Sequence, residues 1–281
     1  MQGRGILAEV VDEIQEIMAD DLDHISVERV SIGLFFTGVK LDAGAAGASA
    51  TPLRSIPEAA CCPSSAAVMP FPGKLRGQPI RNLLPEIEAG SGIRRAVGVA
   101  AINALAALCW ERCPPRDMQL RTGIDAYDAA QIQPRDSVAV IGAFAPFLKS
   151  LKRARQNFIV LEMDPATLKP DEIPYFRPAD QAATVLPSAD VVLITGTTLV
   201  NDTLEGLLAS CRPAARVVVV GPTVGLLPGA FLRRGVDVLG GIRVTAPDAF
   251  LDVLAEGGSG YHLFGRSAEK FVLTRGTAQT A

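Results

Sequence analysis

The feature of this sequence that most limits its fold is a series of short β-branched runs in the second half. Most of these runs are separated by segments long enough for a crossover helix. They are SVAVIG (137–142), NFIVLE (157–162), DVVLIT (190–195), RVVVVG (216–221) and VDVLGG (236–241). Strands that are apolar on both faces and alternate with helices are typical of a parallel sheet. The second half is therefore predicted to be a doubly wound, Rossmann-like α/β domain.

The first half has a different pattern of apolar and small residues. Apolar residues recur at helical spacing over 6–18, and over 27–41 they alternate as in one strand buried chiefly on one face. Residues 95–110 are apolar almost all the way round, which predicts a helix buried on most sides. Residues 42–73 are rich in Ala, Gly, Ser and Pro, and indicate either a short strand with a long loop or a mobile cover over a site.

A proline pair divides the chain. Pro114 and Pro115 end the apolar helix, and a polar connection follows to about residue 134. We therefore expect a small α+β domain over 1–115, a linker over 116–133 and the Rossmann-like domain over 134–281.

Composition narrows the class of protein. With 281 residues, 48% hydrophobic and 20% charged, the chain can bury a large core. A net charge of −3 without a basic cluster gives no reason to expect nucleic acid. The N-terminus does not resemble a secretory signal, and the longest uncharged runs are too short to span a bilayer, so we expect no membrane partner. Five scattered cysteines favour reduced thiols and a cytoplasmic location. A homodimer is the default expectation at this size.

The strand ends are where a ligand is expected, because in open α/β sheets the binding crevice lies beyond the carboxyl ends. Gly142 suggests a phosphate turn, and Glu162 follows it at the offset of a ribose-binding acid. The other two glycines of that signature are missing, and Phe144 and Pro146 occupy part of the space. A standard dinucleotide site is therefore not expected, although S-adenosylmethionine is less constrained. Alternatively, Glu162 caps a strand edge or faces water.

The segment TGTTLVNDT, residues 195–203, follows a predicted strand directly. Asn201 or Asp202 is expected to cap the next helix, with Glu205 completing a capping arrangement. Capping does not explain the several threonines around Gly196. Hydroxyls beside a helix N-terminus suit a carboxylate or phosphate. The turn is therefore predicted to be structural and also to bind an anion.

Several segments together resemble a known family. VIGAFAPF, VLEMDP, LPSADVVLITGTTLVNDTLE, VVVVGPT and VDVLGGIRV resemble DUF364, described as a putative heavy-metal chelation domain. IGLFFTGV, ASAT, FPGKLRGQPI and GVAAINAL are similar to DUF4213, the domain that commonly precedes it. The resemblance covers nearly the whole chain, and ITGTTLVNDTLE is its most specific part.

This resemblance implies a first domain folded like the small N-terminal domain of enolase, a Rossmann-like second domain and a pocket between them. In the first domain, Asn103 is the leading candidate, because an amide in an apolar helix is costly to bury without a partner. Its alternative role is a structural hydrogen bond to a neighbouring loop. The implied ligand-binding residues are Asn103, Gly142, Phe144, Glu162, Gly196, Thr197, Thr198, Asn201, Thr203, Gly221, Pro222 and Thr223.

Cysteines are the alternative, direct metal ligands. Cys109 and Cys113 are four residues apart and would share one helix face, and Cys61 and Cys62 lie in the loop-rich stretch. Four thiolates would suit a soft metal such as Zn or Cu(I). However, the spacings match no standard zinc pattern, and buried cysteines often behave as small hydrophobes.

Three functions stay open. We favour a cytoplasmic protein that binds or processes a heavy metal, a metal chelate or an anionic metal-chelating small molecule in an interdomain pocket. The second is an enzyme that uses S-adenosylmethionine or NAD at the strand ends, and the third is soft-metal sequestration by cysteines. No activated nucleophile or telling pair of acids stands out, so whether the protein is an enzyme is left open.

Overall fold

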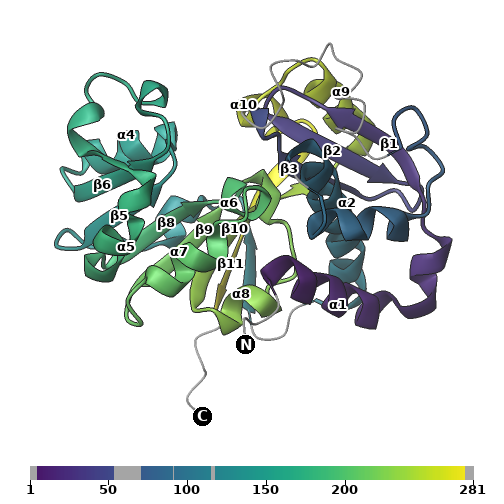
Figure 1. Cartoon of the computed structure of the whole chain (residues 1–281), viewed down its shortest axis with the longest axis horizontal. Helices are drawn as coiled ribbons and strands as arrows, with labels where there is room; N and C mark the ends of the chain where they lie inside the picture. The colour runs from purple at the N-terminus through teal and green to yellow at the C-terminus, as the bar shows by residue number, and fades with distance from the viewer. Residues whose placement is uncertain (1–4, 54–70, 91, 115–117, 276–281) are drawn as a thin grey trace.

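The computed structural model describes residues 5–53, 71–90, 92–114 and 118–275. It contains an eight-stranded sheet and a separate three-stranded antiparallel sheet (Figure 1). The mixed α/β class predicted from the sequence is confirmed. The predicted cover over a site falls largely on residues 54–70, which lie outside the described residues.

The large sheet has the order β4-β11-β10-β9-β8-β5-β6-β7, and the strands from β10 to β7 run parallel. All five predicted strands are present. Their bounds and those of β7 are β5 (Ser137–Ile141), β6 (Asn157–Glu162), β7 (Phe176–Pro178), β8 (Val191–Thr195), β9 (Arg216–Val220) and β10 (Val236–Val244).

Helices cover both faces of this sheet, as a doubly wound fold requires. Along β8, Val192 and Ile194 belong to one hydrophobic cluster while Val191 and Leu193 belong to another, because successive side chains point to opposite faces. The helices are α3 (Ala126–Ala129), α4 (Ala145–Arg153), α5 (Ala182–Val185), α6 (Thr197–Val200), α7 (Leu204–Ser210), α8 (Gly229–Arg233), α9 (Pro247–Ala255) and α10 (Gly260–Leu263).

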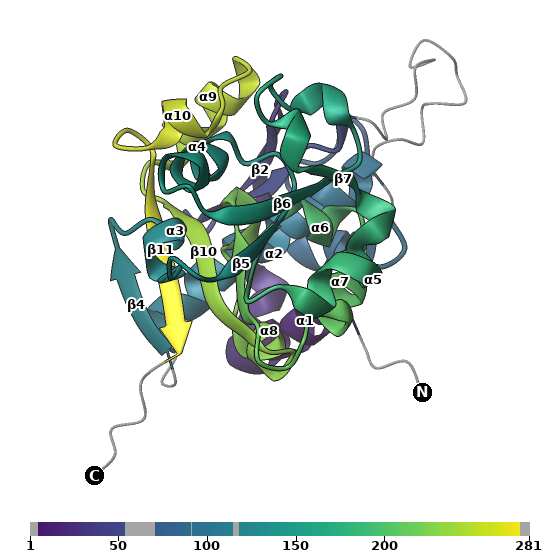
Figure 2. The ribbon, with the colours of Figure 1, turned by 90° about the vertical axis from the view of Figure 1, so that its left-hand side faces the viewer.

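The segment predicted to be a linker carries secondary structure. Within 116–133 the described residues form β4 (Met118–Thr122) and α3, and β4 pairs antiparallel with β11 (Ala268–Arg275) at one edge of the sheet (Figure 2). Four of the five residues of β4 are exposed, so its sequence looks like a polar loop. Its partner lies about 150 residues away, so no local pattern could reveal the pairing.

The first part of the chain wraps a small sheet around one long helix. The elements are α1 (Ile6–Met18), β1 (Val27–Ile32), β2 (Phe36–Leu41), β3 (Ala46–Ala50), α2 (Gly92–Arg112) and the 3₁₀ segments Ala19–His24 and Ile80–Ile87. The prediction of one strand over 27–41 is wrong, because residues 33–35 turn the chain and pair Ile32 with Thr37. The alternation of apolar residues continues through the turn and hides it. A side chain at Gly33 would lie 2.2 Å from the Leu254 carbonyl, so the turn requires glycine.

Helix α2 is the core of this part, as its composition predicts. It is long and apolar enough to cross a membrane by length and composition alone, but 72% of that window is buried inside the protein. It packs on β3 so closely that a Cβ at Gly47 would lie 2.3 Å from the Ala104 nitrogen and 2.4 Å from the Ala100 oxygen.

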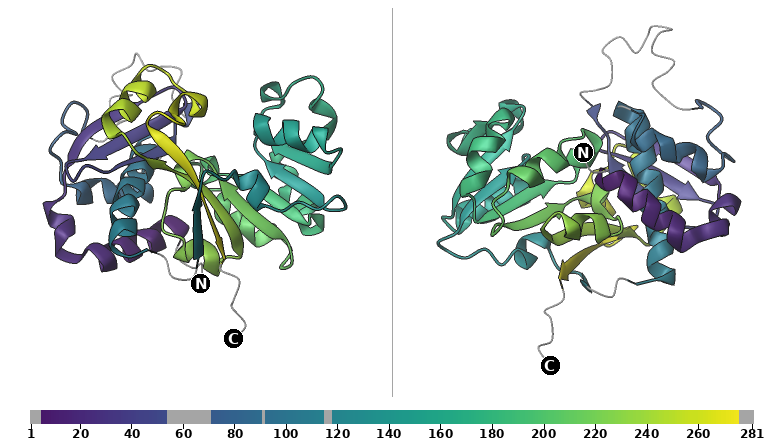
Figure 3. Two further views of the ribbon diagram at one scale, coloured as in Figure 1. Left: turned by 180° about the vertical axis from the view of Figure 1, so that it is seen from behind. Right: turned by 60° about the horizontal axis from the view of Figure 1, so that its bottom comes forward.

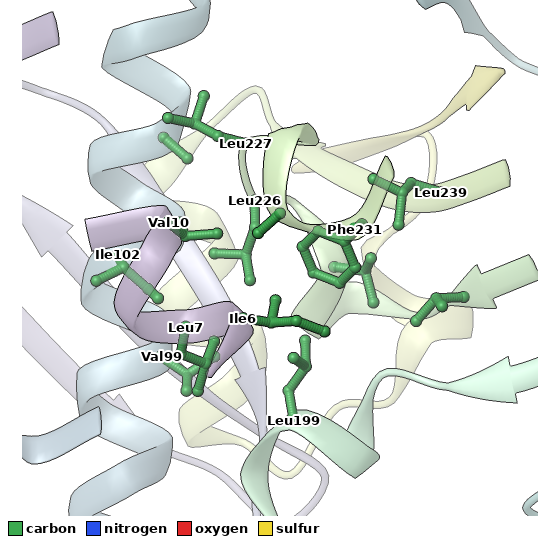
Figure 4. Packing of buried hydrophobic residues seen from close by; sticks show 14 of the residues in the cluster. Ile6, Leu7, Val10, Val99, Ile102, Leu199, Leu226, Leu227, Phe231 and Leu239 are labelled. Carbon is green, nitrogen blue, oxygen red and sulfur yellow. The ribbon is translucent and has the colours of Figure 1, made fainter. Parts of the chain in front are cut away.

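The two parts share one hydrophobic cluster (Figure 4). Ile6 and Val10 of α1 and Val99 of α2 belong to the same buried cluster as Leu226 and Phe231, which come from the second half. Figure 3 shows α1 against both α2 and the α8 region. The predicted domain boundaries stay a prediction, but no solvent layer separates the two parts at this point.

Ion pairs link α1 to the end of α8. The Glu9 carboxylate accepts hydrogen bonds from Arg234 at 2.5 Å and from Arg233 at 2.6 Å. These bonds, the one from Arg234 first, lower the pKa of Glu9 to about 2. The backbone N–H of Ile6, at the start of α1, has no acceptor within the helix and donates instead to the Glu205 carboxylate at 2.7 Å.

We predict that Gly47→Ala destabilises the protein by about 1–3 kcal/mol, because the new methyl group overlaps the α2 backbone. Gly206→Ala is the matched control. Gly206 lies exposed in α7 with nothing within 4 Å of a Cβ, so this change should be neutral or stabilise by up to about 1 kcal/mol. Urea unfolding of both variants checks this, and equal effects would contradict the close packing.

A second prediction concerns acid stability. Because the folded-state pKa of Glu9 lies below its ordinary value of 4.5, its ion pairs contribute fully above about pH 4.5 and less as the pH falls toward 2. The stability difference between the wild type and Glu9→Gln should therefore shrink over that interval. Unfolding free energies measured from pH 7 to pH 2 test this, and a difference independent of pH would refute it.

Candidate functional site

The polar groups predicted at the strand ends gather where the strand order reverses. From β5 the chain continues to β6 and β7 on one side, and β8 then lies on the other side of β5. Gly142 follows β5 with φ +96°, and a Cβ there would lie 3.1 Å from the Thr195 methyl at the end of β8. Such a reversal is where ligands bind in open α/β sheets.

Glu162 holds the neighbouring turn together. Its carboxylate accepts the backbone N–H of Ala143 at 3.0 Å, of Met163 at 2.7 Å and of Asp164 at 3.2 Å. The structure thus gives this side chain the strand-capping role that we considered as the alternative to ribose binding. Phe144 stacks on Phe147, with ring centroids 5.2 Å apart, and so anchors the start of α4.

In the TGTT turn, two threonines serve the backbone and one keeps a free donor. The Thr195 hydroxyl accepts the Thr197 N–H at 3.3 Å and donates to the Thr197 hydroxyl at 3.1 Å. The buried Thr198 hydroxyl donates to the Thr195 carbonyl at 2.6 Å. Within the described residues, the Thr197 hydroxyl proton has no acceptor, and its side chain is half-buried at the sheet edge. Thr197 is therefore free to donate to a ligand.

The predicted capping of the next helix is wrong. Thr203 is the N-cap of α7, with no side-chain cap bond, and its hydroxyl donates to the Asn201 side chain at 2.7 Å. Asp202 instead pairs with Arg95 of α2 at 2.6 Å, and Glu205 binds the start of α1. Both acids have partners from the first half of the chain, which local spacing cannot reveal.

Asn103 joins the two parts of the molecule. Its Nδ2 donates to the carbonyls of Ala48 at 2.9 Å, Val99 at 3.1 Å and Thr223 at 2.9 Å, and it is only 4% exposed. The buried Thr223 hydroxyl in turn accepts the Ala50 N–H at 2.9 Å. This arrangement matches the structural role considered for Asn103, a hydrogen bond to a neighbouring loop.

The predicted ligand-binding residues therefore fall into groups by exposure. Asn103, Thr198 and Thr223 are buried and make hydrogen bonds within the protein, although the Asn103 Oδ1 has no partner among the described residues. Asn201 and Thr203 are exposed on the turn after α6, and Gly196 is buried against Thr223 and Val224. The half-buried residues at the sheet edge are Gly142, Phe144, Glu162, Thr197, Gly221 and Pro222. These half-buried residues are accessible to a ligand and are also held in place by neighbouring residues.

Cys109 and Cys113, the two candidate metal ligands that lie in the described residues, differ in their surroundings. Cys109 is fully buried in the core, and burial raises the pKa of its thiol to about 12, whereas Cys113 is exposed. Cys61 and Cys62 lie outside the described residues. Among the residues that the structure describes, no group of three or more His, Cys, Asp or Glu side chains could hold a metal ion. A buried, protonated Cys109 does not fit a thiolate site.

Two surface hollows lie elsewhere. One of ≈ 500 Å³ lies between α1 and residues 81–88, and one of ≈ 420 Å³ lies between β1 and residues 73–76. Neither is lined by the predicted ligand-binding residues. The predicted pocket between the two domains stays a prediction.

Comparison with known proteins identifies the chain. The sequence model of DUF364, described as "Putative heavy-metal chelation", matches residues 125–273, which is more than half of the chain. The chain belongs to the DUF364 family. The model of DUF4213, with the same description, matches residues 15–106. The predicted family resemblance is confirmed.

Solved DUF364 structures have the same fold as this member. A protein from Pyrococcus horikoshii matches with a TM-score of 0.75 and 22% identity, over 96% of this chain and 100% of that chain. One from Desulfitobacterium hafniense gives 0.72 and 18%, over 95% and 100%. An uncharacterized protein of Methanocaldococcus jannaschii is 28% identical over 190 residues, which span 64% of this chain and 66% of that relative.

We predict that Asn103→Leu destabilises this DUF364 member by about 1–3 kcal/mol, because it leaves buried carbonyls without a donor. Asn82→Leu is the control, since Asn82 is exposed and, among the described residues, its side chain bonds only the Gln78 side chain. Chemical unfolding measures both. Equal, small losses of stability in both variants would show that the contact between the two parts of the molecule does not depend on the Asn103 amide.

Proposed function

We propose that this protein binds a metal chelate, or the anionic small molecule that chelates the metal, at the carboxyl ends of β5 and β8. The observation that supports this most is that Gly142 lies against the Thr195 methyl group where the strand order reverses, next to the hydrogen-bonded hydroxyls of Thr195 and Thr197. The description of the family as a heavy-metal chelation domain supplies the class of ligand.

The chemistry of this edge suits the organic part of a chelate better than a bare cation. A cation seeks ionised carboxylate oxygens. Both oxygens of Glu162 already accept backbone N–H groups. The Thr197 hydroxyl, in contrast, is a donor that fits a carboxylate or phosphate oxygen of a ligand.

The second candidate is an enzyme that uses S-adenosylmethionine or NAD at the same edge. Ribose binding by Glu162 would compete with its three backbone hydrogen bonds. The cytoplasmic location and the homodimer remain predictions.

Thr197→Val tests the proposal, because it keeps the shape of the side chain and removes the donor. Native mass spectrometry and elemental analysis of the purified protein first identify any co-purified chelate. Titration with iron, nickel, copper and zinc citrates, followed by thermal unfolding, then measures affinity. Thr197→Val should weaken binding about three- to tenfold, as expected for one hydrogen bond.

Thr122→Val on the exposed edge strand β4 is the matched control and should bind as the wild type does. Binding of bare metal as strong as that of the chelate would contradict the proposal. Titration with S-adenosylmethionine and NAD in the same assay tests the second candidate.

A further inference from the structure

Two adjacent arginines in the first turn of α2 differ in how their guanidinium groups are satisfied. Arg94 binds the Glu86 carboxylate through two bonds, from Nε at 2.6 Å and from Nη2 at 2.7 Å. Among the residues that the structure describes, Arg95 makes one hydrogen bond, from Nη2 to Asp202 at 2.6 Å, and its Nε has no partner. This Nε is buried, and the whole side chain is only 14% exposed. A buried charged donor without a partner is costly.

Arg95 lies where the two parts of the molecule meet beside the proposed binding edge. The next residue, Ala96, packs with Ala50 of β3 and Val200 of α6. Helix α6 begins at Thr197, and the Arg95 partner Asp202 lies two residues beyond its end. The guanidinium therefore reaches from α2 to the turn that follows the candidate site.

The partner of Arg95 is a weak competitor for it. The Asp202 side chain is 67% exposed, and ion pairs with exposed carboxylates contribute little. The pair uses one N–H of a group with five, and the planar guanidinium is suited to bind a carboxylate or phosphate through two parallel bonds. Glu86 occupies Arg94 in this way, and Arg95 keeps the same capacity unused.

We propose that Arg95 is a ligand-binding residue that holds a carboxylate of the chelating molecule through its Nε and a second N–H. This assignment rests on the proposed function, which gives the place of the ligand. It adds a binding residue from the first half of the chain and specifies that the group bound there is a carboxylate. On binding, the ligand carboxylate satisfies Nε and replaces or joins Asp202. No covalent step is involved.

Isothermal titration of the full-length protein with metal-free citrate and with inorganic phosphate, at low ionic strength, tests this assignment. Arg95→Met should weaken citrate binding by about 10- to 100-fold, the size of a lost charge-assisted hydrogen bond. Arg95→Lys should recover part of the loss. Thermal unfolding confirms that each variant is folded.

Two controls separate binding from structure. Arg94→Met removes a neighbouring positive charge, but the Arg94 guanidinium is already bound to Glu86, so citrate affinity should not change. Asp202→Asn breaks the same ion pair as Arg95→Met but keeps the guanidinium, so citrate should bind as tightly as to the wild type or more tightly. If Arg95→Met and Asp202→Asn behave alike, Arg95 is only half of an interdomain ion pair and the inference is overturned.

The remaining outcomes are equally decisive. No binding of citrate by the wild type, or tighter binding of phosphate than of citrate, overturns the assignment of a carboxylate to Arg95. Citrate binding that depends on Arg95 but is unchanged in Thr197→Val supports Arg95 and contradicts the proposed place of the ligand at the carboxyl ends of β5 and β8. If the wild type and Arg95→Met bind metal citrates equally well, the proposed function is supported and the role of Arg95 is contradicted.

Discussion

The burial of α2 on nearly every side is the constraint on which the rest of the structure depends. Thirteen of its residues are buried, and an apolar helix of this kind must be covered all round. The small sheet covers one side through the close approach at Gly47, and α1 covers another. The 3₁₀ segment Ile80–Ile87 also packs on α2, and further cover comes from α6 and the segment Pro222–Val224, which follow strands of the large sheet. The second half of the chain is therefore needed to complete the core of the first.

The same dependence operates in the opposite direction. Helix α9 follows the last parallel strand, yet it packs on the outer face of the small sheet, where a Cβ at Gly38 would lie 2.5 Å from Leu251. Arg29 binds Asp252 at 2.7 Å and Lys40 binds Asp248 at 2.9 Å on either side of this contact. With Glu205 at the start of α1, these bonds tie the two halves at several separate points. The two halves are therefore held together by side-chain bonds as well as by the shared core.

Sequence reasoning succeeded where the signal was local and failed where it was distant. The parallel strands are apolar on both faces, so β5, β6, β8, β9 and β10 could each be predicted from six residues. The hairpin turn at Gly33 and the edge strand β4 could not, because they are fixed by Leu254 and β11. In the candidate site, the gathering of strand ends followed from topology. The bonds that occupy Glu162 and Asn103, and the single bond of Arg95, depend on side-chain placement that spacing does not encode.

The place of β11 has a consequence for synthesis on the ribosome. This strand comes last among the described elements, yet it lies inside the sheet, between β4 and β10. Until residues 268–275 emerge, β4 has no neighbour and β10 keeps an unpaired edge. The small sheet likewise waits for α9 to cover its outer face. The nascent chain thus presents open strand edges and apolar surface until residues 268–275 have been synthesised, and exposed surface of this kind favours aggregation.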